Sequence, residues 1–281
     1  MADFSRYLIV SDIDGTYIAP DGSLVQRNMD AIDRFKAAGG LFTISSGRIS
    51  CTIHPNIPLI PETLNAPAML SNGALLYDFQ TGEYADETFV SKEDCCELLA
   101  FFAEHTPDAI LQLSAREGMF FNGETERIRH YVAPSFPGTI FFEPTDKWPL
   151  SHAYKVVLRE TPERLAELRP LLEERFGDRL AVTTSGKKML EVQNRSCNKA
   201  IGIEKLRRTL KDAKDRIVIA CGDFENDIEM LAAADISVCP ANACDKVKAI
   251  ADYQLCSCGE GLIADIIEGL ENGTLVPKED V

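Results

Sequence analysis

The chain has 281 residues, of which 45% are hydrophobic and 26% are charged, so it can bury one large core or two smaller ones. Its formal net charge of −15 argues against a nucleic-acid backbone or an anionic membrane as a general partner. No apolar run approaches the roughly 20 residues of a membrane-spanning helix, which argues against an integral membrane protein.

The N-terminal part of the chain is predicted to form a strand, a helix and a second strand. Residues 7–11 are a mainly apolar, strand-like run. Ser23, with Gln26 three residues later, has the spacing of a helix capping box. Apolar residues then recur at helical spacing until the glycine pair at 39–40 ends the helix, and residues 41–44 read as the next strand. This order predicts a parallel pair of strands joined by a crossover helix.

The next segment, residues 51–67, is expected to contain no long helix, because it has prolines at positions 55, 58, 61 and 67. Residues 68–70 read as a third strand, the Ser-Asn-Gly sequence at 71–73 as a turn, and residues 74–77 as a further strand-like run. The sheet is therefore expected to continue beyond the proline-rich segment.

Residues 81–186 differ in character and are predicted to form a separate, inserted α/β domain of about 100 residues. Its predicted elements alternate, with helices at 92–104 and 162–176 and strands at 109–112, 153–158 and 180–183. The aromatic residues Trp148, Phe120 and Phe121 have two interpretations. One is a pocket lining, and the preferred one is core packing or a cap surface.

From residue 187 to residue 281 the chain is predicted to return to the first domain, whose other part is residues 1–80. The predicted elements alternate again, in the order helix 198–210, strand 216–220, helix 227–233 and strand 236–238. Alternating strands and helices are typical of a doubly wound parallel sheet. We therefore expect an α/β fold class, with a Rossmann-like core in two chain segments and the α/β domain inserted between them.

The nine cysteines are interpreted as reduced thiols. Because the N-terminus lacks the pattern of a secretory signal, this predicts a cytoplasmic location. A zinc site is the less favoured interpretation of four of them, since their spacing is not a repeated CxxC pair: Cys239, Cys244, Cys256 and Cys258. The histidines at 54, 105, 130 and 152 are scattered and are assigned no role in catalysis.

Four short motifs at the ends of predicted elements carry the functional signal. In chain order they are Asp12 and Asp14 after the first strand, Ser46 within residues 44–48, Lys199 at a helix start, and Asp223 with Asp227 after an apolar strand. Each alone has an ordinary explanation, such as an Asp-Gly turn, a calcium loop, a helix cap or a solvated lysine. Together they resemble the haloacid dehalogenase superfamily of aspartate-nucleophile phosphotransferases, and more narrowly its Cof-type sugar-phosphatase group, which has an inserted cap domain.

The resemblance implies a nucleophile and an acid/base group in the first motif. Asp12 is expected to attack phosphorus and form an aspartyl-phosphate, while Asp14 protonates the leaving alcohol and later deprotonates the attacking water. Gly15 lets the backbone turn away from the strand, and Thr16 is expected to tie that turn. An EF-hand calcium loop, the alternative, requires glycine at the sixth position, where this chain has Tyr17.

The resemblance also implies a phosphate site in the second and third motifs. The Ser46 hydroxyl and the backbone at Gly47 are expected to bind phosphoryl oxygens, with Ser45 as the rival hydroxyl. Arg48 is expected either to reach the phosphate or to brace a carboxylate. Lys199 is expected to contact the phosphate and the nucleophile, where it offsets the charge that develops during transfer.

Carboxylates gathered at neighbouring strand ends repel one another unless a cation is bound, and the resemblance implies Mg²⁺. The expected ligands are the side chains of Asp12 and Asp223 and the backbone carbonyl of Asp14. Asp227 is expected to orient a metal-bound water or the third-motif lysine from outside the ligand set. Asn226 is expected to donate a hydrogen bond to the phosphate or the substrate.

The leading interpretation is a Mg²⁺-dependent phosphatase that acts on a small phosphorylated metabolite, expected to be a sugar phosphate. Two alternatives stay open: a phosphomutase of the same superfamily, and a non-catalytic phosphometabolite-binding protein. The cap is expected to close over the substrate and select it, and Asn242 is expected to shape the core near the site. The Cof-type group usually has a helix after the second motif, so the proline-rich segment 51–67 departs from that pattern. No nucleic-acid or membrane partner is expected, and neither the substrate's identity nor the oligomeric state follows from the sequence.

Overall fold

The computed structural model describes residues 3–19, 21–53, 57, 60–126, 128–132, 136, 138–184, 188–210 and 213–278. The chain divides into two compact units. The first comprises Met1–Gly47, Leu59–Asp86 and Asn198–Val281, and the second comprises Arg48–Pro58 and Glu87–Cys197. Each unit has its own sheet and its own buried hydrophobic cluster.

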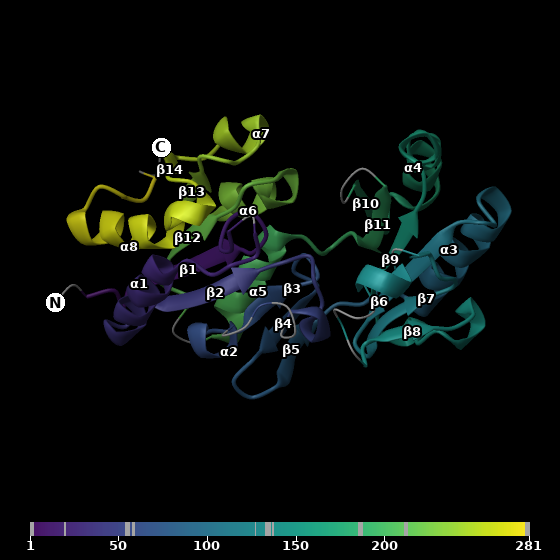
Figure 1. The fold of residues 1–281 in the computed structure, drawn as a ribbon, viewed down its shortest axis with the longest axis horizontal. Helices are drawn as coiled ribbons and strands as arrows, with labels where there is room; N and C mark the ends of the chain where they lie inside the picture. Colours follow the sequence, from purple (N-terminus) through teal and green to yellow (C-terminus); the bar gives the residue numbers. More distant parts are fainter. Residues whose placement is uncertain are drawn as a thin grey trace. The chain divides into compact units, whose positions relative to one another are not determined.

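The first unit is built on an eight-stranded sheet with the order β14-β13-β12-β1-β2-β3-β4-β5 (Figure 1). Its strands are β1 (Tyr7–Asp12), β2 (Leu41–Ser45), β3 (Ala68–Leu70), β4 (Leu75–Asp78), β5 (Glu83–Glu87), β12 (Ile217–Cys221), β13 (Ile236–Pro240) and β14 (Tyr253–Leu255). From β14 to β3 each strand is parallel to its neighbours, whereas β4 runs antiparallel to β3. The central strands are mainly apolar, as expected for a parallel sheet that is covered on both faces.

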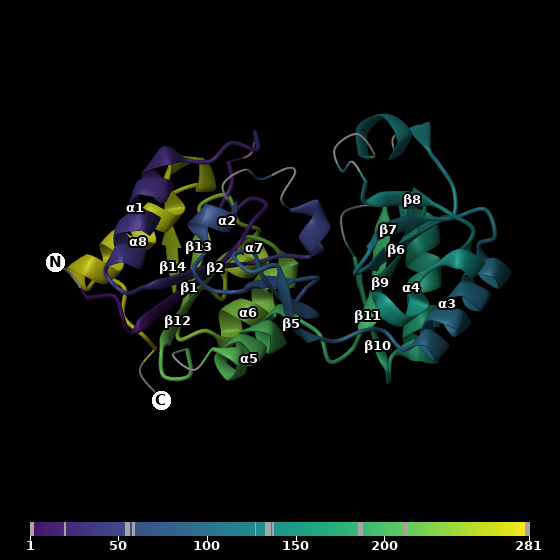
Figure 2. The ribbon, with the colours of Figure 1, turned by 90° about the horizontal axis from the view of Figure 1, so that it is seen from below.

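Helices cover both faces of this sheet (Figures 1 and 2). On one face α1 packs against α8, and on the other face α5 packs against α6. The helices of this unit are α1 (Gln26–Ala37), α2 (Ile60–Thr63), α5 (Lys199–Thr209), α6 (Ile228–Ala233), α7 (Asp245–Lys248) and α8 (Leu262–Asn272). Leu8 of β1, Ile203 of α5 and Met230 of α6 lie in one buried cluster. Among the described residues of both units, no helix is long and apolar enough to cross a membrane.

The strand order changes direction between β1 and β12. From β1 the chain moves outward to β2 and β3, and it later returns to β12 on the other side of β1. In open α/β sheets, ligands bind beyond the carboxyl ends of the strands at such a point. The register sets Asp12 beside Ser45 and Ser11 beside Cys221. The residues that follow β1, β2 and β12 therefore lie along one edge of the sheet.

The second unit has a six-stranded sheet with the order β10-β11-β9-β6-β7-β8, in which the β7–β8 pair is parallel and the other pairs are antiparallel. Its strands are β6 (Ile110–Ala115), β7 (Gly118–Phe121), β8 (Ile140–Phe142), β9 (Ala153–Arg159), β10 (Leu180–Thr184) and β11 (Met189–Asn194). Helices α3 (Lys92–His105) and α4 (Pro162–Phe176) lie on one face of this sheet (Figure 2). Trp148 and Phe120 belong to the buried cluster of this unit, as the core-packing interpretation predicted.

The limits of the second unit differ from the inserted domain expected at 81–186. β11 pairs with both β9 and β10, so the second sheet continues past residue 187 and the unit ends at Cys197. Residues 186 and 187 themselves lie outside the described residues. The described part of the proline-rich segment has only short helices, α2 and the 3-10 turn η1 (Ser50–Thr52), while Pro55 and Pro58 also lie outside the described part.

The predicted capping box at Ser23 is wrong. The Ser23 hydroxyl donates to Asp21 Oδ1 at 2.6 Å, and α1 begins only at Gln26. Val25 occupies the N-cap position and provides no side-chain hydrogen bond. The Ser23 hydroxyl therefore binds the preceding loop and does not cap α1.

Candidate active site

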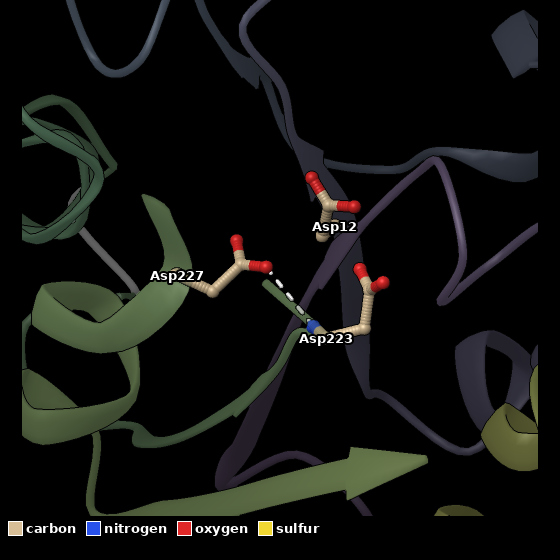
Figure 3. A group of neighbouring side chains, drawn as sticks. All are labelled: Asp12, Asp223 and Asp227. Carbon is tan, nitrogen blue, oxygen red and sulfur yellow. Dashed lines mark hydrogen bonds between the residues drawn. The ribbon is translucent and has the colours of Figure 1, made fainter. Parts of the chain in front are cut away.

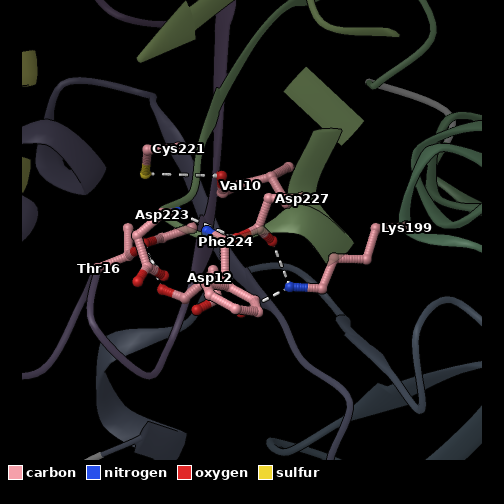
Figure 4. Close-up of polar contacts among 9 residues, drawn as sticks. Val10, Asp12, Thr16, Lys199, Cys221, Asp223, Phe224 and Asp227 are labelled. Atoms are coloured by element: carbon pink, nitrogen blue, oxygen red, sulfur yellow. Dashed lines mark hydrogen bonds and ion pairs between the residues drawn. The ribbon is translucent and has the colours of Figure 1, made fainter. Parts of the chain in front are cut away.

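The side chains of Asp12, Lys199 and Asp227 form a charged cluster at the carboxyl edge of the first sheet (Figure 4). Lys199 Nζ donates to Asp12 Oδ1 at 2.6 Å and to Asp227 Oδ1 at 2.5 Å. The side chains of Lys199 and Asp227 are fully buried, and that of Asp12 is 10% exposed. One ammonium thus faces two carboxylates in a region that water hardly reaches.

Lys199 is placed here by the start of α5, of which it is the first residue. Asn198 is the N-cap, since its Oδ1 accepts a hydrogen bond from Ile201 N at 2.8 Å. A cation at a helix N-terminus is unfavourable by itself, because the helix dipole is positive there. The two carboxylates that contact Lys199 offset this repulsion.

Asp223 completes a group of three carboxylates (Figure 3). One oxygen from each of Asp12, Asp223 and Asp227 can be chosen so that all lie within 4.8 Å of one another. Thr16 Oγ1 donates to Asp223 Oδ1 at 3.2 Å. Gly15 has a φ of 85°, and a Cβ at this residue would lie 2.5 Å from Asp223 Oδ2. The turn after β1 therefore requires glycine in order to approach Asp223.

Both oxygens of Asp227 accept hydrogen bonds from protein donors. Oδ1 accepts from Lys199, whereas Oδ2 accepts from the backbone N–H groups of Asp223 at 3.0 Å and Phe224 at 3.1 Å. A Cβ on Gly222 would lie 2.4 Å from Asp227 Cγ, so glycine permits this close approach. Asp227 consequently links the lysine to the loop that carries Asp223.

Burial changes the proton affinity of these groups. It raises the pKa of Asp12 to about 8, although the Lys199 ammonium opposes the rise. Burial also raises the pKa of Asp223 to about 6, and the charge of Asp227 adds to this. For Lys199, burial alone would lower the pKa, but the neighbouring carboxylates raise it overall. Oxygen donors and an excess of buried negative charge are the features that fit a divalent cation such as Mg²⁺.

Ser46 and Gly47 lie at the same edge of the sheet. They directly follow β2, whose last residue, Ser45, is the register partner of Asp12. Ser46 is 3% exposed, and its backbone N–H donates to Met69 O in β3 at 2.9 Å. The structure thus brings the second motif next to the first.

The remaining predicted residues have different surroundings. Asp14 and Asn226 have exposed side chains. Asn242 Nδ2 donates to Gly15 O at 2.8 Å, so this asparagine braces the turn after β1. Arg48 belongs to the second unit.

The cysteines considered for a zinc site do not form a metal-binding group in the described part of the chain. There, the three carboxylates are the one group of His, Cys, Asp or Glu side chains close enough to share an ion. All nine cysteines are free thiols.

Sequence reading missed one contact of the second motif. The sequence predicts only a connecting turn at 71–73, whereas in the structure Asn72 N donates to Ser46 O at 2.9 Å. The available signal was the Asn-Gly pair, because asparagine and glycine tolerate left-handed backbone at turns that other residues avoid.

Comparisons with known proteins agree with the family resemblance of the motifs. A family profile of haloacid dehalogenase-like hydrolases matches residues 9–267. The HMP-PP phosphatase of Yersinia pestis is 26% identical over 245 residues, which cover 86% of each chain. The chloroplastic endoribonuclease YBEY of Arabidopsis thaliana is 26% identical over 269 residues, but the chain spans only 45% of that relative's length.

Solved structures show the same architecture. SMU.1108c from Streptococcus mutans matches with a TM-score of 0.80 and 25% identity, covering 94% of this chain and 98% of that one. The subclass IIB sugar phosphatase BT4131 matches with a TM-score of 0.78 over 94% and 99% of the two chains, but at 19% identity this likeness concerns the fold alone. The predicted α/β fold class and the prediction of an enzyme are thereby confirmed. The resemblance seen in the motifs is confirmed as well, and the chain belongs to the haloacid dehalogenase-like hydrolases.

Proposed function

We propose that this hydrolase is a Mg²⁺-dependent phosphatase that cleaves a small phosphorylated metabolite through an aspartyl-phosphate on Asp12. The observation that carries the proposal is the cluster in which Lys199 contacts Asp12 and Asp227, with Asp223 beside them. Family membership supports hydrolysis, and the relatives from Yersinia pestis are named phosphatases.

The covalent chemistry needs two carboxylates and one water. In the first step a carboxylate oxygen of Asp12 attacks phosphorus, the bond to the ester oxygen breaks, and Asp14 gives its proton to the leaving alcohol. In the second step Asp14 takes a proton from water, whose oxygen attacks phosphorus. The bond to Asp12 then breaks and inorganic phosphate leaves. The exposed side chain of Asp14 suits a group that exchanges protons with both substrate and water.

Lys199 orients the nucleophile and favours its ionised form. The burial of Asp12 favours its protonated form. An ammonium 2.6 Å from Asp12 Oδ1 opposes this effect, because it stabilises the carboxylate. Asp227 holds Lys199 through one oxygen and the loop of Asp223 through the other. Because both oxygens are engaged, we assign Asp227 a positioning role and not a place among the metal ligands.

Phosphate binding is assigned to the second motif. Ser46 and Gly47 would bind phosphoryl oxygens from the end of β2, and the exposed amide of Asn226 would be a further donor. Thr16 is assigned to Asp223, because its hydroxyl already donates to that carboxylate. The role of Arg48 stays a prediction.

The metal would be held by the side chains of Asp12 and Asp223 and by the backbone carbonyl of Asp14. When bound, Mg²⁺ offsets negative charge on the phosphoryl group and on the carboxylates. The raised pKa values of Asp12 and Asp223 support this assignment, since they mark buried negative charge that no nearby cation balances fully.

The substrate is proposed to be a small phosphate ester, with a sugar phosphate as the expectation from the motif resemblance. The name of the Yersinia relatives supports a small phosphorylated metabolite in general. The net charge of −15 argues against a nucleic-acid substrate. The free thiols support the predicted cytoplasmic location.

The experiment is phosphate release from p-nitrophenyl phosphate, measured with Mg²⁺ and with EDTA. Asp12→Asn is expected to lower kcat by about 10³-fold or more. Asp215→Asn, at an exposed residue before β12, is the matched control and is expected to keep full activity. Full activity in Asp12→Asn would exclude the nucleophile. With sugar phosphates, isomerised product without free phosphate would indicate a phosphomutase, and tight binding without turnover would indicate a binding protein.

A further inference from the structure

The turn after β3 has an unusual backbone. Ser71, Asn72 and Gly73 have φ values of 49°, 52° and 81°, so all three lie in the left-handed region. Residues other than glycine rarely adopt this conformation, and they keep it only where their surroundings impose it. Strained residues of this kind cluster at functional sites, which makes the contacts of the turn informative.

One side of the turn contacts the segment to which phosphate binding is assigned. Asn72 N donates to Ser46 O at 2.9 Å, and Ser46 N donates to Met69 O at 2.9 Å. Both backbone polar groups of Ser46 are therefore held by β3 and its turn. A Cβ on Gly47 would lie 3.1 Å from Asn72 Oδ1. The Asn72 carboxamide is thus packed directly against the backbone of Gly47.

Another side of the turn contacts the start of α5. A Cβ on Gly73 would lie 2.1 Å from Asn198 O and 3.0 Å from Gly202 N. Asn198 is the N-cap of the helix that begins with Lys199. One short turn therefore contacts both the segment of Ser46 and the segment of Lys199.

We propose that Asn72 is a positioning residue for phosphate binding, a role that rests on the phosphatase function proposed for this site. Its backbone N–H and its carboxamide hold Ser46 and Gly47 in a fixed position relative to the helix start that carries Lys199. Asparagine suits this position because it tolerates left-handed backbone and because its neutral side chain does not repel a phosphate dianion. A phosphate then meets donors that are already in place, so binding it requires less ordering of the protein.

Two substitutions separate the carboxamide from the backbone conformation. Asn72→Gly keeps the left-handed backbone and removes the carboxamide, whereas Asn72→Asp keeps the shape and adds a negative charge. For Asn72→Gly we expect the KM for p-nitrophenyl phosphate and the dissociation constant of inorganic phosphate to rise about tenfold, with kcat nearly unchanged. The reason is that the contact between the carboxamide and Gly47 is lost and that glycine gives the turn more conformational freedom. Asn72→Asp is expected to weaken phosphate binding by at least about another tenfold through charge repulsion.

Calorimetric titration of inorganic phosphate in the presence of Mg²⁺ is the main measurement, and thermal melting checks that each variant is folded. Asn272→Asp is the matched control, because it adds the same charge at an exposed residue at the carboxyl end of α8. It should bind phosphate as the wild type does.

Unchanged phosphate affinity in both Asn72 variants would overturn the proposal, and so would an equal loss in Asn272→Asp. A lowered melting temperature with normal phosphate affinity would assign Asn72 a purely structural role and would also overturn it. Should Asn72→Gly fail to fold, the isosteric Asn72→Asp decides. A wild type that binds phosphate but hydrolyses no ester would refute the phosphatase function. The comparison of phosphate affinity between the wild type and the Asn72 variants would still be decisive, because phosphate binding does not require turnover. A wild type that binds no phosphate would refute both.

Discussion

Replacing Lys199 by methionine tests the charged cluster most directly, because methionine keeps most of the apolar stem and removes the ammonium. The substitution leaves Asp12 and Asp227 as neighbouring carboxylates that have lost a cation 2.6 Å and 2.5 Å away. Their side chains are 10% and 0% exposed, so water replaces little of the lost interaction. Removing one partner of a buried ion pair costs about 3–5 kcal/mol.

We therefore expect the free energy of unfolding of Lys199→Met to fall by about 3–5 kcal/mol in metal-free buffer at pH 8. The loss should be smaller at pH 5. Burial already raises the pKa of Asp12 above that of the unfolded chain, and without the ammonium this pKa rises further. The folded variant therefore keeps a proton that the unfolded chain has released, so the penalty appears only as the pH rises above the unfolded pKa. Urea titration at the two pH values measures both quantities, and phosphate release should fall by about 10³-fold or more.

Lys205→Met is the matched control on the same helix. Lys205 is 3% exposed, but its partner Asp86 has a side chain that is 31% exposed, and neither residue belongs to the carboxylate cluster. We expect a loss of about 1–2 kcal/mol and unchanged activity. Equal unfolding free energies for Lys199→Met and the wild type at pH 8 would refute the reasoning, as would a loss of the same size at both pH values.

Two further predictions concern the metal site and the turn after β1. Burial raises the pKa of Asp12 to about 8 and that of Asp223 to about 6. Above pH 4 the metal-free folded state therefore keeps protons that the unfolded chain has released. Its free energy of unfolding should fall as the pH rises from about 4 to about 8. Saturating Mg²⁺, which competes with those protons, should raise the melting temperature more at pH 8 than at pH 5, and the reverse order would contradict the assignment. Gly15→Ala, whose Cβ would lie 2.5 Å from Asp223 Oδ2 at a φ of 85°, is expected to lose about 2–5 kcal/mol and to bind Mg²⁺ more weakly. Gly22→Ala, at a φ of 83° with no atom within 4 Å of the added Cβ, should lose only about 1–2 kcal/mol, and equal losses in the two variants would show that backbone strain alone is responsible.

The position of the candidate site could be predicted because its motifs follow strands that local composition reveals. Asp12, Ser46 and Asp223 each come after an apolar run that forms a strand of the first sheet. Parallel strands bring their carboxyl ends to one edge, so the convergence of these residues followed from topology without any knowledge of side-chain contacts.

The features that could not be predicted depend on pairing between distant residues. The sequence of β11 alternates as a strand should, but only its pairing with β9 assigns it to the second sheet. Ser23 has the spacing of a helix cap, yet its hydroxyl donates a hydrogen bond to the nearby Asp21 instead. The sequence around Asn72 indicates only an ordinary turn, because the contact of Asn72 with Ser46 exists only when β2 and β3 are neighbours.

The hydrogen bond between Lys199 and Asp12 joins residues 187 positions apart in the chain, and that between Asp223 and Thr16 spans 207 positions. Closing such long loops costs conformational entropy before the contact contributes any stabilisation, so we expect these contacts to form late in folding. During synthesis, Asp12 leaves the ribosome early, but Lys199, Asp223 and Asp227 follow only after the whole second unit has been made. If Asp12, Lys199 and Asp223 act as proposed, a chain that stops before Asp223 is expected to be inert toward phosphate esters, and the onset of hydrolysis would report that both segments of the first unit have folded together.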